Sequence, residues 1–191
     1  MKVFLSGSRA LSRLNQQIRD RLEGITSQSF EIVIGDASGA DKSLQTFLSD
    51  YGYSNVTVYC SGGRCRNNVG GWGVHNVDVP PGARGRDIYT QKDRAMAKEA
   101  DYGFVLWDGR SPGSLENVIA LLRGGKSALV YYSPEREFIS VCSSNHLKQL
   151  LSRIGFEALE KIEKKIKLEK LLDDLDGGAQ PELELPSYSG T

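Results

Sequence analysis

The chain lacks an excess of either charge and a long hydrophobic run. Its 24 lysines and arginines balance 24 aspartates and glutamates. This balance argues against a general nucleic-acid groove, because such grooves carry a basic excess. No apolar run is long enough to cross a membrane and no secretory leader is recognisable, so we expect a cytoplasmic protein without membrane or nucleic-acid partners.

Cysteine is also scarce, with three residues in 191. Cys60 and Cys65 lie close in sequence and His75 follows, but a fourth ligand is missing and the spacing matches no standard zinc knuckle. We therefore predict no metal and no cofactor. Instead of a metal site we expect three reduced thiols. Cys142 is expected in the core, and the other two at a strand end and in a loop.

Three segments share one pattern: a short apolar strand, a turn of small polar residues and an amphipathic helix. In an open parallel sheet such turns emerge at the carboxyl edge, where ligands bind at the point of strand-order reversal. We therefore expect the three turns to converge on one crevice. The strands cover residues 2–5, 30–34 and 100–107, and the turns are Ser6-Gly7-Ser8-Arg9, Gly35-Asp36-Ala37-Ser38-Gly39-Ala40-Asp41 and Asp108-Gly109-Arg110-Ser111-Pro112-Gly113-Ser114.

The third turn is the most informative of these. Pro112-Gly113-Ser114 would let an anion approach the unpaired N–H groups of a helix start, and Glu116 would lie beside it in the first helical turn. The sequence thus predicts a phosphate site with a neighbouring carboxylate. The alternative is an ordinary turn, in which Ser114 caps the helix and Glu116 complements the helix dipole.

The order and spacing of the three turns, with Met96 and Ala100-Asp101 between the second and the third, resemble the SLOG superfamily of Rossmann-like nucleotide binders. Its relatives include the LOG phosphoribohydrolases, nucleoside 2-deoxyribosyltransferases and YspA-like proteins. The similarity covers roughly residues 1–142. It implies a pocket for a nucleotide or nucleotide derivative.

The resemblance also implies chemistry at the N-glycosidic bond. Glu116 matches a glutamate that assists cleavage in the hydrolase and transferase branches, where a carboxylate can stabilise or attack an oxocarbenium-like C1′. Lys92 stands where the family carries an arginine, and Arg94 lies two residues before Met96. A lysine lacks the planar fork of arginine, so the two are not equivalent. The candidate catalytic residues are Glu116 and Arg94.

Further residues are expected around the ligand because they lie on or near the three turns. They are Gly7, Ser8, Arg9, Gly35, Ser38, Gly39, Asp41, Lys92, Asp108, Gly113 and Ser114.

Residues 61–87 lose periodicity and are rich in glycine, which predicts a long loop. Its cations and its tryptophan could fold over an anionic, aromatic ligand, or the segment could be a flexible insertion without a role. The residues concerned are Arg64, Arg66, Trp72, His75, Arg84 and Arg86.

Residues 1–154 are predicted to form an α/β domain with a Rossmann-like open, mainly parallel sheet and helices on both faces. Residues 155–176 are predicted to form a charged amphipathic helix, with Leu159, Ile162 and Ile166 suited to packing on the chain's own body or on a second subunit. Residues 177–191 are acidic, poor in core-forming types and expected to be disordered.

Two functional classes remain open. The protein is an N-glycosidase, phosphoribohydrolase-like hydrolase or glycosyl transferase acting on a nucleotide, or it is a non-catalytic sensor of a stress or defence system. A sensor would signal through the C-terminal helix or through oligomerisation, and we expect a homo-oligomer. Fold resemblance alone does not choose between the two classes.

Overall fold

The computed structural model describes residues 1–177, so the predicted tail lies outside the described residues except for Gly177. The strands are β1 (Lys2–Gly7), β2 (Glu31–Gly35), β3 (Val56–Ser61), β4 (Gly73–Val77), β5 (Tyr102–Trp107), β6 (Ser127–Tyr132) and β7 (Glu137–Val141). The helices are α1 (Gln16–Ser27), α2 (Ala40–Asp50), α3 (Arg86–Glu99), α4 (Pro112–Arg123), α5 (Ser144–Leu151), α6 (Phe156–Ile166) and α7 (Leu168–Gly177).

The strands form one sheet in the order β4-β3-β2-β1-β5-β6-β7. Every neighbouring pair is parallel except β6 with β7, which is antiparallel. The chain runs outward from β1 to β4 and then returns to place β5 on the other side of β1. The predicted Rossmann-like, mainly parallel α/β fold is therefore confirmed, with an antiparallel strand at one edge.

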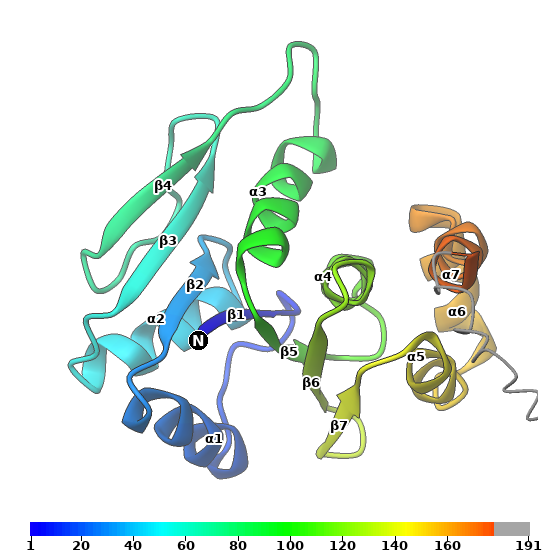
Figure 1. Ribbon diagram of the computed structural model, residues 1–191, viewed down its shortest axis with the longest axis horizontal. Coiled ribbons are helices and arrows are strands. Elements are labelled where there is room, and N and C mark those ends of the chain that lie inside the picture. Colours follow the sequence, from blue (N-terminus) through cyan, green and yellow to red (C-terminus); the bar gives the residue numbers. More distant parts are fainter. Residues whose placement is uncertain (178–191) are drawn as a thin grey trace, which may run out of the picture.

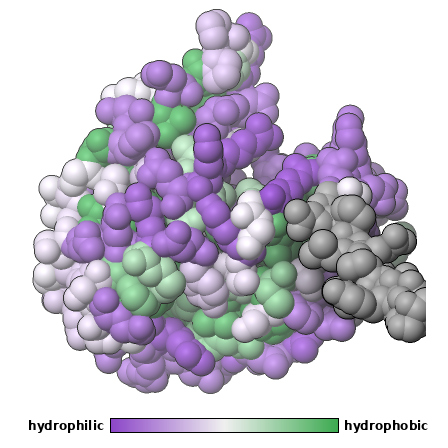
Figure 2. All heavy atoms as spheres, viewed as in Figure 1, coloured by the Kyte–Doolittle hydropathy of each residue, from purple (hydrophilic) through white to green (hydrophobic). Residues whose placement is uncertain are grey.

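Helices cover both faces of the sheet because alternate strand residues face opposite sides. Val3 and Leu5 of β1 belong to the core under α1 and α2, whereas Phe4 belongs to the core under α3 and α4. Figure 1 shows these two layers, with α5, α6 and α7 gathered beyond β7. On the face drawn in Figure 2, hydrophilic residues dominate and hydrophobic ones form small scattered groups.

The apolar spacing of Leu11, Leu14, Ile18 and Leu22 predicts that the first helix includes Leu11 and Leu14, and the structure differs. The first helix begins at Gln16, because the side chain of Asn15 accepts a hydrogen bond from the N–H of Ile18 and caps it there. Leu11 and Leu14 therefore lie in the preceding loop, where they still pack against the core. The predicted 61–87 loop contains β4, which pairs with β3 at the sheet edge although its residues are largely exposed.

The single C-terminal helix predicted for residues 155–176 is wrong, because two helices occupy this segment. Lys167 separates them and adopts a left-handed conformation with φ 52°. Ile162 and Ile166 are buried in the core cluster that includes residues of α4 and α5. Within residues 1–177 the apolar stripe thus packs on the chain's own body. No helix in this range is both long and apolar enough to span a membrane.

Candidate functional site

A cavity of about 370 Å³ lies at the carboxyl edge of the sheet, beside the ends of β1 and β2 and the start of α4. The strand order reverses between β1 and β5, the position at which open α/β sheets bind ligands. The cavity therefore lies where the sequence predicted a crevice. Seven residues predicted as site residues line it: Gly7, Arg9, Asp41, Lys92, Gly113, Ser114 and Glu116.

The start of α4 offers free backbone donors to this cavity. Ser111 is the N-cap but makes no side-chain cap bond, and Pro112 at the first position has no N–H. No partner within residues 1–177 accepts from the N–H groups of Gly113 or Ser114. A side chain built on Gly113 would meet nothing within 4 Å, so this turn is open to an approaching anion.

A buried hydroxyl group adds a second polar feature. Ser6 lines the cavity and is only 4% exposed. Its Oγ atom has no hydrogen-bond partner among the described residues. An unpartnered buried hydroxyl is costly, so a ligand group in the cavity would be stabilised by pairing with it.

Cationic side chains outnumber carboxylates around the cavity. Asp41, Asp93 and Glu116 supply negative charge, and the five cations are Arg9, Arg66, Arg86, Lys92 and Lys165. Lys165 comes from α6, so the C-terminal helices contribute to the cavity wall. The excess of positive charge favours an anionic ligand.

Glu116 lies in the second turn of α4, not in the first as predicted, because the helix begins at Pro112. Burial raises the pKa of its carboxyl, while the charge and hydrogen bond of Arg86 act in the opposite direction. Arg86 forms an ion pair with this carboxylate. The candidate catalytic carboxylate is thus engaged by a cation of α3.

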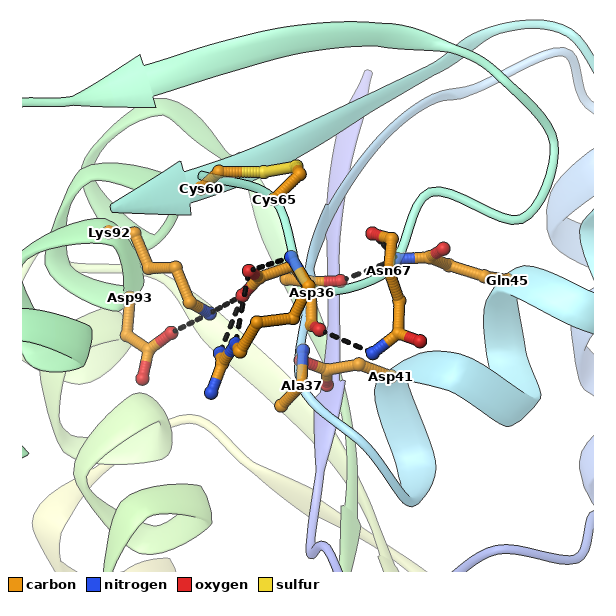
Figure 3. Close-up of polar contacts among 11 residues, drawn as sticks. Asp36, Ala37, Asp41, Gln45, Cys60, Cys65, Asn67, Lys92 and Asp93 are labelled. Carbon is orange, nitrogen blue, oxygen red and sulfur yellow. Dashed lines mark hydrogen bonds and ion pairs between the residues drawn. A yellow bond between two sulfur atoms is a disulfide. The ribbon is translucent and has the colours of Figure 1, made fainter. Parts of the chain in front are cut away.

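Asp36, at the end of β2, is the centre of a buried ion cluster (Figure 3). Its carboxylate accepts hydrogen bonds from Nε and Nη2 of Arg66, at 3.1 and 2.6 Å, and from the Arg66 backbone N–H. Burial acts to raise the pKa of Asp36, but these bonds outweigh it and the pKa lies below its ordinary value. Lys92 Nζ lies 3.7 Å from the same carboxylate.

Asp41 and Lys92 form the inner wall of the cavity. Asp41 Oδ2 accepts a hydrogen bond from the N–H of Ala37, and Lys92 Nζ donates to Asp93. Burial raises the pKa of Asp41 to about 6, although the charge of Lys92 opposes it. Burial also acts to lower the pKa of Lys92, but the charges of Asp93 and Asp41 outweigh it and the pKa is raised.

Several predicted ligand-binding residues instead hold the turns together. Ser8 Oγ donates to Asp108 at 2.8 Å, which ties the turn after β1 to the turn after β5. Asp108 also accepts from the N–H groups of Arg110 and Ser111. Neither Ser8 nor Asp108 lines the cavity.

Two predicted glycines are required by close packing. A Cβ atom on Gly39, whose φ is +78°, would lie 2.2 Å from the carbonyl oxygen of Arg9. One on Gly35 would lie 2.5 Å from both Asp41 Oδ2 and Lys92 Nζ. Gly39 therefore lets two turns touch, and Gly35 makes room for the charged inner wall.

Two remaining predicted residues also lie outside the cavity lining. Ser38 is exposed. Arg94 lines a neighbouring groove between α3 and α4, which shares Glu116 and Asn117 with the cavity. Arg94 is thus not among the residues that line the cavity in front of Gly113.

The prediction of reduced, separate thiols is contradicted, because Cys60 and Cys65 form a disulfide. Cys60 at the end of β3 was placed correctly, but Cys142 is exposed rather than in the core. Asp36 lies within 4.8 Å of both sulfur atoms, yet its oxygens already bind Arg66. These three residues therefore do not fit a metal site.

Sequence reasoning missed most of the α3 contribution, because no separate motif marks that helix. Of the residues singled out in the 61–87 segment, Arg66 and Arg86 line the cavity, whereas Arg64, Trp72, His75 and Arg84 do not. Other lining residues that were not predicted are Ser6, Ala37, Tyr89, Thr90, Asp93, Met96, Ser111, Pro112, Asn117 and Lys165.

No protein-family model, no curated protein and no solved structure matches this chain.

Proposed function

We propose that the cavity binds a nucleotide or nucleotide derivative, with a phosphate on the N-terminus of α4. The observation that carries this proposal is the open turn at Gly113 and Ser114 beside five cationic side chains. Free N–H groups at a helix start, together with nearby cations, are the elements that bind phosphate in many α/β proteins. The SLOG resemblance of the three turns supports the same proposal.

The remaining lining groups suit the rest of a nucleotide. Tyr89 offers an aromatic ring on which a base could stack, and Asn117 and Thr90 offer hydrogen-bonding groups. Glu116 lies one turn beyond the proposed phosphate seat, where a ribose attached to that phosphate would come. The candidate reaction is cleavage or transfer at the N-glycosidic bond of this ligand.

A sensor without catalysis is the second candidate, and the Arg86–Glu116 ion pair favours it. A carboxylate neutralised by an arginine is less able to stabilise positive charge at C1′. Lys165 also connects the cavity to α6, through which binding could be transmitted to the C-terminal helices.

The binding proposal is tested by replacing Gly113 with valine. A valine side chain would fill the open space before α4, so we expect at least about a tenfold loss of affinity for nucleoside monophosphates in calorimetry. Gly24→Val on α1 is the matched control, because it also has nothing within 4 Å and lies away from the cavity. The control should bind as the wild type does.

Unchanged nucleotide affinity of Gly113→Val would show that the phosphate does not bind at this turn. A wild-type protein that binds no member of the nucleoside monophosphate panel, AMP and GMP included, would contradict the proposed function.

A further inference from the structure

The Cys60–Cys65 disulfide joins the sheet to a loop that carries part of the cavity wall. Cys60 is a buried residue of β3, and Cys65 is partly exposed in the connection to β4. The next residue, Arg66, lines the cavity. The bridge, drawn in Figure 3, therefore fixes the chain at Cys65, immediately before a cation of the candidate site.

Arg66 connects three elements through its own contacts. Its backbone N–H and its guanidinium bind Asp36 at the end of β2. The guanidinium also lies 4.1 Å from the centre of the Tyr89 ring on α3, which lines the same cavity. The position of one loop residue thus determines both the pairing of Asp36 and one edge of the cavity.

Apart from the bridge, the loop between the two cysteines has one backbone anchor among the described residues, a hydrogen bond of 3.5 Å from the N–H of Gly62 to the carbonyl oxygen of Val77. Gly62, Gly63 and Arg64 are exposed, and both glycines have positive φ and no atom within 4 Å of where a Cβ would lie. Beyond Arg66, by contrast, Asn67 donates to the carbonyl of Asp36 and Val69 donates to Gln45. Loss of the bridge would therefore free the segment between the cysteines and leave Arg66 held only by its own bonds to Asp36 and by the anchored residues that follow it.

We propose that Cys60 and Cys65 form a reversible redox switch that sets the position of Arg66 and, with it, the affinity of the cavity for an anionic ligand. The oxidised form holds Arg66 on Asp36 and Tyr89 and is the tighter binder. The statement about affinity rests on the proposed function, whereas the statement about Arg66 does not.

The chemistry is thiol–disulfide exchange with a dithiol reductant. A thiolate of the reductant attacks Sγ of Cys65, the more accessible sulfur, and the electron pair of the S–S bond leaves on Cys60 Sγ, which takes a proton. The second thiolate of the reductant then displaces Cys65 from the mixed disulfide. Two electrons and two protons pass to the cysteines, and the reductant becomes a disulfide.

Hydrogen exchange of the full chain tests the switch without any ligand. In the oxidised protein the Arg66 amide is protected by Asp36, so we expect its exchange to accelerate at least about tenfold after reduction with dithiothreitol. Cys65→Ser should exchange rapidly under both conditions. Cys142→Ser removes the exposed free thiol and should keep the full response to the reductant.

Equal exchange of Arg66 in the oxidised and reduced proteins would overturn the switch, as would alkylation showing that the pair stays reduced under an oxidant. Slow exchange of the Arg66 amide in reduced protein that retains zinc would show a metal site instead.

Titration with AMP tests the part of the proposal that concerns the ligand, with at least about threefold weaker binding expected after reduction. Equal AMP affinity in the oxidised and reduced proteins would overturn that part. Absence of AMP binding in both states would count against the proposed function, and hydrogen exchange would then decide the statement about Arg66 alone.

Discussion

At the residue scale, the inner wall of the cavity is defined by charges that are almost fully buried. Lys92 is 2% exposed and Asp41 is 6% exposed, and Asp36 and Asp93 complete the cluster around the ammonium group. Buried charges persist only when they are paired, and this cluster supplies such pairs. Asp41 is the member whose ionisation is most strongly opposed by burial.

The raised pKa of Asp41 predicts a specific pH dependence of stability. Its folded-state pKa of about 6 exceeds the ordinary value of 3.8. Between these values the folded protein binds more protons than the unfolded chain, so the contribution of Asp41 to the free energy of unfolding falls as pH rises. Asp41→Asn should therefore gain stability relative to wild type between about pH 4 and pH 7, by up to about 3 kcal/mol.

Urea unfolding of the wild type and of Asp41→Asn, at about pH 4 and at about pH 7, measures this difference in the free energy of unfolding. Asp50→Asn is the control, because Asp50 is exposed at the end of α2 and its replacement should show no such change. A difference between wild type and Asp41→Asn that does not vary with pH would contradict the prediction.

Single residues were predictable where a local pattern requires them. Gly113 follows Pro112 at a helix start, and this sequence alone indicates an open N-terminal turn. The roles of Ser8 and Asp108 were not predictable, because their hydrogen bond joins residues 100 positions apart. Arg66 was recognised as a loop cation, but its partner Asp36 depends on how the whole connection folds.

At the scale of elements, the sequence predicted well those helices whose apolar periodicity and caps agree. It failed at the C-terminus. The irregular apolar step between Ile166 and Leu168 argues against a sustained coiled coil, but it does not by itself mark the end of a helix. Lys167 ends α6 in a left-handed conformation, which sequence periodicity does not reveal for a non-glycine residue. The short, exposed β4 was missed because it lacks the alternation of a half-buried strand.

The burial of α6 on its own chain predicts the effect of a charge in its apolar stripe. Ile162 is 0% exposed, so Ile162→Glu would place an unpaired carboxylate in the core. We expect the free energy of unfolding to fall by about 2–5 kcal/mol, measured by chemical denaturation. Lys161→Glu at the adjacent exposed position should change it by less than about 0.5 kcal/mol.

Light scattering shows whether this stripe serves a second subunit as well. If Ile162→Glu converts an oligomer to a well-folded monomer of unchanged stability, the packing of α6 on its own chain would be refuted.

At the scale of the whole molecule, the fold class, an open and mainly parallel sheet with helices on both faces, followed from the sequence because three strand-turn-helix units leave few topologies open. The same topology brings the ends of β1, β2 and β5 to one edge and thereby creates the cavity. Most of the α3 contribution, Lys92 and Arg86 apart, and all of the α6 contribution could not be predicted, since they depend on how distant helices pack across the sheet. Fold and site position were therefore more predictable than the complete lining.

The distinction between enzyme and sensor also belongs to the whole molecule and is decided by Glu116→Gln. If Glu116 stabilises an oxocarbenium-like C1′, the variant should retain nucleotide binding and lose release of free base by about a hundredfold or more, because the interaction acts mainly in the transition state. Chromatography of base released from nucleoside monophosphates, beside calorimetry of binding, gives both quantities.

Asn117→Ala is the matched control for this substitution, because Asn117 is the next residue of α4 and lines the same cavity without a carboxylate. It should alter binding more than turnover of bound ligand. For an enzyme, Arg86→Ala should change base release as well, since its guanidinium holds the Glu116 carboxylate in the unliganded protein. Tight nucleotide binding by the wild type with no base released from any nucleotide of the panel would reject the enzymatic candidate and leave the sensor, in which the Arg86–Glu116 ion pair is a binding element only.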